Sequence, residues 1–132
     1  MYIANLYDIQ VLPLRADNVI WQCDTWTDTS TLDCSHLALT EFVLPPDFNT
    51  SIITTLILKD NQLRLIPELS ALGNLENLDL SGSEIRSVTD SDLLGLHRLI
   101  QLDLSMNEGF ILSNDSINPT AFRHVPKLKT LK

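Results

Sequence analysis

The strongest constraint on the fold is a spacing of apolar residues that recurs along the chain. In residues 75–80, Leu-Glu-Asn-Leu-Asp-Leu, leucines stand at the first, fourth and sixth places. The same form occurs at residues 53–58 and 99–104, and a fourth copy begins at Leu128 and stops at Lys132. A period of this kind predicts a stack of similar units and takes priority over interpreting each segment on its own.

Successive copies differ in length but close in the same way. Their first apolar residues stand at 53, 75, 99 and 128, so the copies are 22 (75 − 53), 24 (99 − 75) and 29 (128 − 99) residues long. Each copy closes with apolar residues at a spacing of three, as in Leu69, Leu72 and Leu75. The extra residues therefore lie in the middle of a copy, and the longest copy carries an insertion around residues 108–118.

Numbering each copy from its first apolar residue places further apolar residues at positions 4, 6, 11 and 14. Positions 4 and 6 point the same way on a strand, whereas positions 3, 5 and 7 point to the other face. One coil cannot bury its leucine pair alone, so we expect stacked coils with parallel strands. The predicted fold is an α/β solenoid with a parallel β-sheet on its concave face and an irregular or short helical convex side.

Position 9 carries a polar side chain in each copy: Asn61, Ser83 and Asn107. The chain turns away from the strand there and leaves backbone groups that a buried amide, both donor and acceptor, can satisfy. We therefore predict a structural asparagine ladder formed by Asn61 and Asn107. Ser83 can make fewer hydrogen bonds, so its turn is expected to be the weaker one.

Two cysteines, Cys23 and Cys34, lie eleven positions apart in a stretch rich in Thr and Asp that indicates a loop or hairpin. Zinc binding is disfavoured because His36 is the only further ligand nearby. A disulfide would stabilise the short loop by roughly 3 kcal/mol in an oxidising compartment. Acceptor patterns for N-glycans at Asn49 and Asn114 agree with that compartment. Together these features favour a secreted or cell-surface protein.

Composition and motif searches argue against several classes of function. A net charge of −8, from 9 Lys+Arg and 17 Asp+Glu, disfavours nucleic acid as a partner. No apolar run reaches the ~18 residues of a membrane helix, and the first twenty residues do not resemble a signal peptide. The three histidines have no serine or cysteine partner at a motif spacing, and no Gly-rich phosphate loop occurs. We therefore predict no enzyme activity, cofactor, metal or membrane contact within this segment.

Residues 32–132 resemble the extracellular leucine-rich repeat, L-x-x-L-x-L-x-x-N-x-L followed by an F-x-x-L close. Residues 23–51, which include Leu-Asp-Cys-Ser-His-Leu and a later Leu-Pro-Pro, look like the amino-terminal cysteine cap of animal leucine-rich repeat proteins. The two-cysteine form is similar to that of Toll-like receptors and of the platelet receptor for von Willebrand factor. The resemblance implies a cysteine cap at residues 21–52 and three repeats plus the start of a fourth at 53–132. Residues 1–20 show only weak alternation followed by a polar stretch, so we expect an extended lead-in of uncertain order there.

The resemblance also implies a function. It is that of a non-enzymatic extracellular recognition module, most like the amino-terminal part of a Toll-like receptor ectodomain, that binds a protein or microbial ligand. Two alternatives are an extracellular matrix or adhesion protein, and an intracellular leucine-rich repeat scaffold in which the cysteines are reduced. Because the fourth copy stops early, its leucines are expected to form an open end that allows self-association.

Candidate binding residues follow from the alternation along each strand. The residues expected to line the concave face are Thr55, Ile57 and Lys59, then Asn77, Asp79 and Ser81, then Gln101, Asp103 and Ser105. Adjacent parallel strands lie ~4.8 Å apart, so two of them, Asp79 and Asp103, become neighbours able to accept a basic peptide or a cation. Aspartate at this place is also ordinary repeat sequence, where it serves solubility.

The insertion offers a second candidate at Phe110. It belongs to an apolar run, residues 110–112, beside the acceptor pattern of Asn114. Phe110 either forms a binding site on a loop or packs inward in place of the leucine that Gly109 replaces at position 11.

Overall fold

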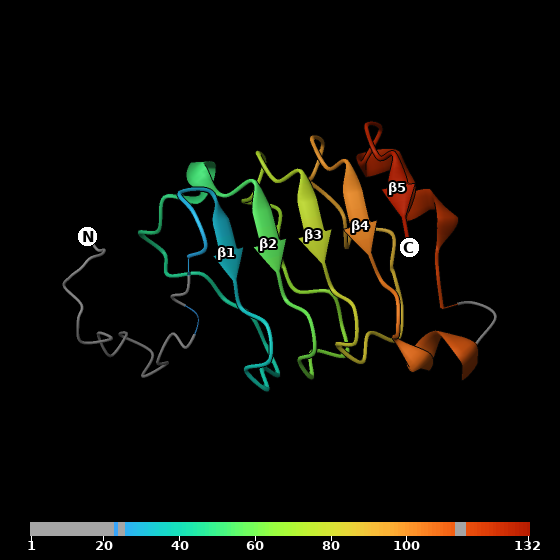
Figure 1. The fold of residues 1–132 in the computed structure, drawn as a ribbon. Coiled ribbons are helices and arrows are strands. Elements are labelled where there is room, and N and C mark those ends of the chain that lie inside the picture. The colour runs from blue at the N-terminus through green and yellow to red at the C-terminus, as the bar shows by residue number, and fades with distance from the viewer. Residues whose placement is uncertain (1–22, 24–25, 113–115) are drawn as a thin grey trace.

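A computed structural model of the protein describes residues 23, 26–112 and 116–132, so the predicted lead-in at residues 1–20 lies outside the described residues. Its framework is one sheet of five parallel strands arranged in chain order (Figure 1). The strands are β1 (Thr31–Asp33), β2 (Thr55–Ile57), β3 (Asn77–Asp79), β4 (Gln101–Asp103) and β5 (Thr130–Leu131). Each strand pairs with the strand one coil later, which gives the chain a solenoid-like course.

The segments that return from one strand to the next consist of turns and short 3-10 helices. The helices are η1 (Thr50–Ile52), η2 (Glu108–Leu112) and η3 (Pro119–His124). Within the described residues no α-helix forms, so the irregular or short helical return predicted from the sequence is confirmed.

The core lies between the sheet and these returning segments. The middle residue of each of the first four strands is a leucine that is at most 2% exposed: Leu32, Leu56, Leu78 and Leu102. The residues that flank them in the strands are half-buried or exposed and point to the other face. Position 1 adds a second buried column, Ile53, Leu75 and Leu99. Each such side chain contributes about 1.5–3 kcal/mol by its burial, so the columns hold successive coils together.

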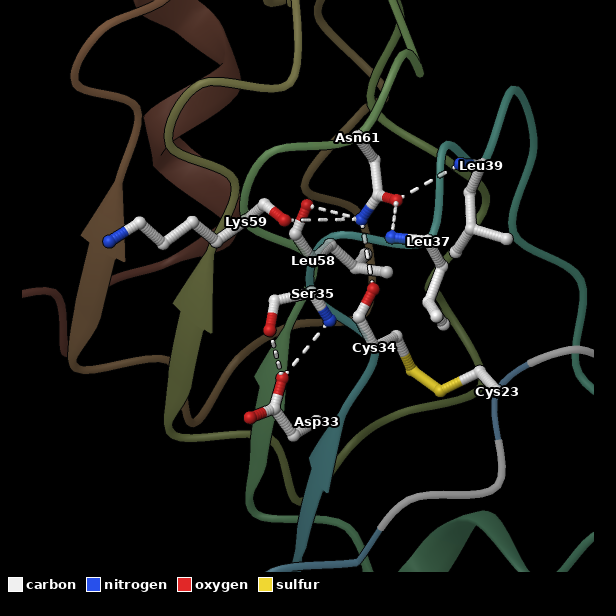
Figure 2. Close-up of a disulfide and its surroundings, with 9 residues drawn as sticks. All are labelled: Cys23, Asp33, Cys34, Ser35, Leu37, Leu39, Leu58, Lys59 and Asn61. Atoms are coloured by element: carbon white, nitrogen blue, oxygen red, sulfur yellow. Dashed lines mark hydrogen bonds between the residues drawn. A yellow bond between two sulfur atoms is a disulfide. The ribbon is translucent and has the colours of Figure 1, made fainter.

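The asparagine ladder is confirmed. Asn61 Nδ2 donates to the carbonyls of Cys34, Leu58 and Lys59, and its Oδ1 accepts the amides of Leu37 and Leu39 (Figure 2). Asn107 lies two coils after Asn61, with Ser83 in the coil between them, and makes the equivalent five hydrogen bonds.

Ser83 occupies the intermediate step of this ladder with a smaller set of bonds. Its Oγ donates to the Leu58 carbonyl at 2.6 Å and accepts the Asn61 amide at 3.2 Å. All three ladder residues are buried. The line of polar side chains therefore crosses three coils, and its middle residue, Ser83, makes fewer hydrogen bonds than the two asparagines.

A left-handed residue follows every one of the first four strands. Position 8 is His36, Asp60, Gly82 or Met106, and its φ lies between +57° and +63° in all four coils. Only one of the four is glycine, although the left-handed region favours glycine. The turn geometry is thus imposed by the stacking of coils rather than by the residue at that position.

The insertion lies entirely between Asn107 and Ile117. Strand β4 is offset from β3 by 24 residues (101 − 77), whereas the bridge between Val88 and Ile117 has an offset of 29 (117 − 88). The difference of five residues is accommodated in the segment that contains η2. Phe110, in η2, is partly buried and packs against the core, so the inward-packing interpretation of this residue is confirmed.

The two ends of the sheet differ. At the first end, Cys23 and Cys34 form a buried disulfide with a Cα–Cα distance of 5.2 Å (Figure 2). Trp26 forms an antiparallel bridge with Leu32, which agrees with the predicted hairpin, and its ring stacks on Phe48. At the other end, β5 has β4 as its only partner within the described part of the chain, and Leu131 is 52% exposed.

Candidate binding face of the sheet

The outward face of the sheet carries two rows of side chains set by the strand register. The first residues of the strands form one row: Thr31, Thr55, Asn77, Gln101 and Thr130. Asn77 Nδ2 donates to Thr55 Oγ1 at 3.1 Å, which links two neighbouring strands. This row is uncharged and presents hydroxyl and amide groups that can both donate and accept hydrogen bonds.

The third residues of the strands form the second row. It contains Asp33, Ile57, Asp79 and Asp103, and Lys132 continues it because Leu131 pairs with Leu102. The predicted pairing of Asp79 with Asp103 in register is confirmed. The row therefore changes along the sheet from acidic to apolar, then to two carboxylates, and ends on a cation.

Each aspartate of this row is held by the serine two residues later. Oδ1 of Asp33, Asp79 and Asp103 accepts the serine amide at 2.9–3.0 Å and the serine hydroxyl at 2.6 Å. Figure 2 shows this arrangement for Asp33 and Ser35. Among the described residues, Oδ2 of Asp79 and Asp103 accepts no hydrogen bond. The serine fixes the carboxylate through Oδ1 and does not occupy Oδ2.

The expectation that Ser81 is exposed is wrong, and the serine clamp is the reason. Ser81 is only 5% exposed because its hydroxyl turns toward Asp79. Ser105 is half-buried and bonds Asp103 in the same way. These two residues support the face rather than line it. Lys59, which replaces serine in the coil that lacks the aspartate, is exposed as expected.

The charges around Asp103 define the electrostatics of the face. Partial burial of Asp103 would raise the pKa of its carboxyl, but the hydrogen bonds from Ser105 and the positive charges of Lys132 and Lys59 outweigh burial and lower it. Asp103 is therefore ionised at neutral pH. The two lysines lie close enough to act on the Asp103 carboxylate, so the face combines both signs of charge.

A shallow depression of about 190 Å³ runs over this part of the sheet. It is lined by side chains of strands β2 to β5 and by Lys132; the residues that point outward into it are Thr55, Asn77, Asp79, Gln101, Asp103, Thr130 and Lys132. The depression brings together five of the nine residues predicted to line the face. Ile57, Lys59, Ser81 and Ser105 are not among its lining residues.

The remaining candidates lie outside the depression. Ile57 is half-buried, and Asn49 is exposed beside η1. Asn114 lies outside the described residues. His36 is exposed and its Nδ1 lies 3.3 Å from Asp60 Oδ2, in the turns that follow β1 and β2.

Two features were missed by sequence reasoning. The serine clamp was visible as a recurring Asp-x-Ser at positions 5 and 7, and this repeated pair was the available signal. The second is an ion pair on the returning segments, where Arg123 binds both carboxylate oxygens of Asp90 at 2.8 and 3.0 Å. Asp90 and Arg123 stand 33 residues apart and follow no repeat, so nothing in the sequence indicated their contact.

The described residues contain neither a cluster of metal ligands nor a helix that could span a membrane. No group of three or more His, Cys, Asp or Glu side chains in this part of the chain is placed to hold a metal ion. None of the helices described has the length and apolar character needed to cross a membrane.

Comparison with known proteins adds no further assignment. No model of a known protein family matches the chain, and a search of curated proteins also returns no match.

Proposed function

We propose that the chain is a non-enzymatic extracellular recognition module that binds its ligand on the outward face of the sheet. Within this proposal it is a leucine-rich repeat protein, most like the amino-terminal part of a Toll-like receptor ectodomain, and its ligand is a protein or a microbial molecule. The observation that carries the proposal is the register of β2 to β5, which gathers polar side chains from four coils over one depression.

The chemistry of the face supports recognition rather than catalysis. Its side chains are amides, hydroxyls, carboxylates and an ammonium group, held on strands and fixed in part by the serine clamp. Groups held rigidly before binding lose little conformational entropy when a ligand arrives, which favours affinity. The buried disulfide supports an oxidising, extracellular type of compartment and weighs against the intracellular scaffold.

The proposal can be tested by screening the folded protein against purified extracellular proteins and microbial envelope polysaccharides. The affinity of each binder is then measured for Gln101→Arg, which places a bulky cation in the first row, inside the depression. We expect a loss of affinity of roughly tenfold or more, equivalent to about 1.4 kcal/mol.

Gln62→Arg is the matched control. Gln62 is exposed in the turn after β2, away from the depression, and the substitution adds the same side chain. A ligand that loses affinity with Gln101→Arg and keeps it with Gln62→Arg supports the proposal. Equal losses for both variants, or no specific ligand in either class, would overturn it.

A further inference from the structure

We propose that Asn49 carries an N-linked glycan, attached through Nδ2 at the rim of the sheet where the strands begin. Asn49 precedes Thr50 and Ser51, which completes the acceptor pattern Asn-x-Ser/Thr. The pattern alone occurs often by chance. The inference therefore depends on how the structure presents these three residues and on the compartment that the disulfide indicates. It does not rest on the proposed ligand or on the face of the sheet.

The side chain of Asn49 divides its two polar atoms between separate tasks. Its Oδ1 accepts the Ser51 amide at 3.2 Å and the Ser51 hydroxyl at 2.6 Å. Its Nδ2 donates no hydrogen bond to the described residues, and the residue is exposed. The sugar would therefore be attached to an exposed residue through a nitrogen that holds no described contact, while Oδ1 supports η1.

The modification preserves these contacts because it changes only the nitrogen. Nδ2 forms a bond to the anomeric carbon of the sugar and gives up one proton. The bond between that carbon and its phosphate oxygen in a lipid-linked diphospho-oligosaccharide donor breaks, and the lipid diphosphate leaves with the bonding electrons. Oδ1 remains an amide carbonyl oxygen, so it continues to accept both bonds from Ser51.

The position of Asn49 also leaves room for a glycan. Figure 1 shows η1 at the edge of the sheet where β1 and β2 begin, away from the middle of the strands. Asn74 of the next coil donates a hydrogen bond from its Nδ2 to the Ser51 carbonyl at 2.9 Å, so this contact with the segment is made at Ser51. A glycan at this rim would extend into solvent and leave the depression over β2 to β5 open.

The chain contains an internal comparison at Asn118. Its Oδ1 accepts the amide and hydroxyl of Thr120 at 3.0 and 2.7 Å, which reproduces the geometry of Asn49 and Ser51. Pro119 stands between them, and proline at this place prevents glycosylation. The two sites share one local arrangement and differ in whether the acceptor pattern is intact.

The test is to express the full chain behind a cleavable secretory leader in animal cells and to map glycans on both the retained and the secreted protein. Peptide-N-glycosidase F, which releases the glycan and converts the linked asparagine to aspartate, identifies the modified residue. Asn114→Asp is used as the background because it removes the other acceptor pattern. We expect release of one glycan from residue 49.

Two variants make the result specific. Asn49→Asp keeps an oxygen for both Ser51 bonds but has no amide nitrogen, so it should fold and carry no glycan. Pro119→Ala completes the pattern at Asn118 and should add a glycan there. An unmodified residue 49 in a sample where Asn118 of Pro119→Ala is modified would overturn the proposal, as would an unmodified residue 49 in both retained and secreted wild-type protein.

Discussion

Asn107 holds the backbone of Ser83, because the Ser83 amide nitrogen donates a hydrogen bond to Asn107 Oδ1 at 3.0 Å. The Oγ of Ser83 accepts the Asn61 amide in turn, so each polar residue in the line binds the backbone of the preceding coil. Leucine columns alone would tolerate small sliding between coils, because hydrophobic contact has no preferred direction. The polar line is directional and fixes the turn of one coil against the next.

Replacing the two kinds of ladder residue should therefore have unequal effects. Asn107→Ala leaves two amides and three carbonyls without their side-chain partner, and we expect a loss of about 3 kcal/mol in the free energy of unfolding. Ser83→Ala removes fewer bonds and should lose about 1 kcal/mol. Urea unfolding followed by Trp fluorescence measures both. Equal losses would show that the ladder does not depend on the number of bonds.

The ladder illustrates what a sequence period can predict. Polar residues at position 9 fall where the chain leaves the strand, so their structural role and the weaker step at Ser83 followed from the count of positions. The strand register and the Asp79 and Asp103 pair followed in the same way, because a fixed period places equivalent residues side by side.

Gly95 is a position where the backbone requires glycine. Its φ is +87°, and a Cβ there would lie 2.7 Å from the Ser70 carbonyl oxygen and 3.0 Å from the Ser70 Cα. We expect Gly95→Ala to lower the free energy of unfolding by about 2 kcal/mol or more, from left-handed strain together with a backbone clash.

Gly73 provides the matched control for this substitution. A Cβ at Gly73 would lie 3.7 Å from the His97 ring, an ordinary contact, and its φ is outside the left-handed region. Gly73→Ala should be neutral or raise stability by about 0.4–1 kcal/mol through the unfolded chain. Thermal melts of the two variants distinguish them, and a Gly95→Ala protein as stable as Gly73→Ala would contradict the expected strain.

Met106 is a non-glycine residue in a left-handed backbone conformation, so here the substitution to glycine is expected to relieve strain. It is 81% exposed and has a φ of +59°, a region that costs a residue with a Cβ about 1–2 kcal/mol. Met106→Gly removes that cost and loses little packing, so stability should rise by about 0.5–1 kcal/mol after the entropy of glycine is included. Chemical unfolding provides the measurement.

Leu65 tests whether the gain at Met106 comes from the backbone. Leu65 is also exposed, at 63%, but its φ is not positive. Leu65→Gly should therefore lower stability by about 0.5–1 kcal/mol. If both glycine variants changed stability in the same direction, the explanation from φ would be wrong.

The details of the binding face were harder to predict than its register. Alternation along a strand assigns a side to each residue, but it does not say whether a short side chain turns back to its neighbour. Ser81 was expected to be exposed for that reason, yet its hydroxyl bonds Asp79 and is buried. The pair formed by Asp90 and Arg123 depends on how the insertion reshapes the last coil, and no period encodes that shape.

The pKa of Asp103 gives a prediction that links the serine clamp to acid stability. The pKa is lowered in the folded protein: partial burial opposes ionisation, but the Ser105 hydrogen bonds and the charges of Lys132 and Lys59 favour it. A carboxyl with a depressed folded pKa stabilises the fold above its unfolded pKa, for which the ordinary value is 3.8. That contribution disappears as the pH falls from this value through the folded pKa.

Ser105→Ala removes the hydroxyl bond while keeping the backbone amide, so the pKa of Asp103 should rise toward its ordinary value. NMR titration of the carboxyl carbon measures the pKa directly, and the midpoint of acid unfolding should move to higher pH by the same linkage. Ser91→Ala, an exposed serine that does not bond Asp103, should leave both quantities unchanged. An unaltered pKa of Asp103 in Ser105→Ala would show that the backbone amide of residue 105 and the two lysines lower this pKa without the hydroxyl, and the hydroxyl would then act only on the orientation of the carboxylate.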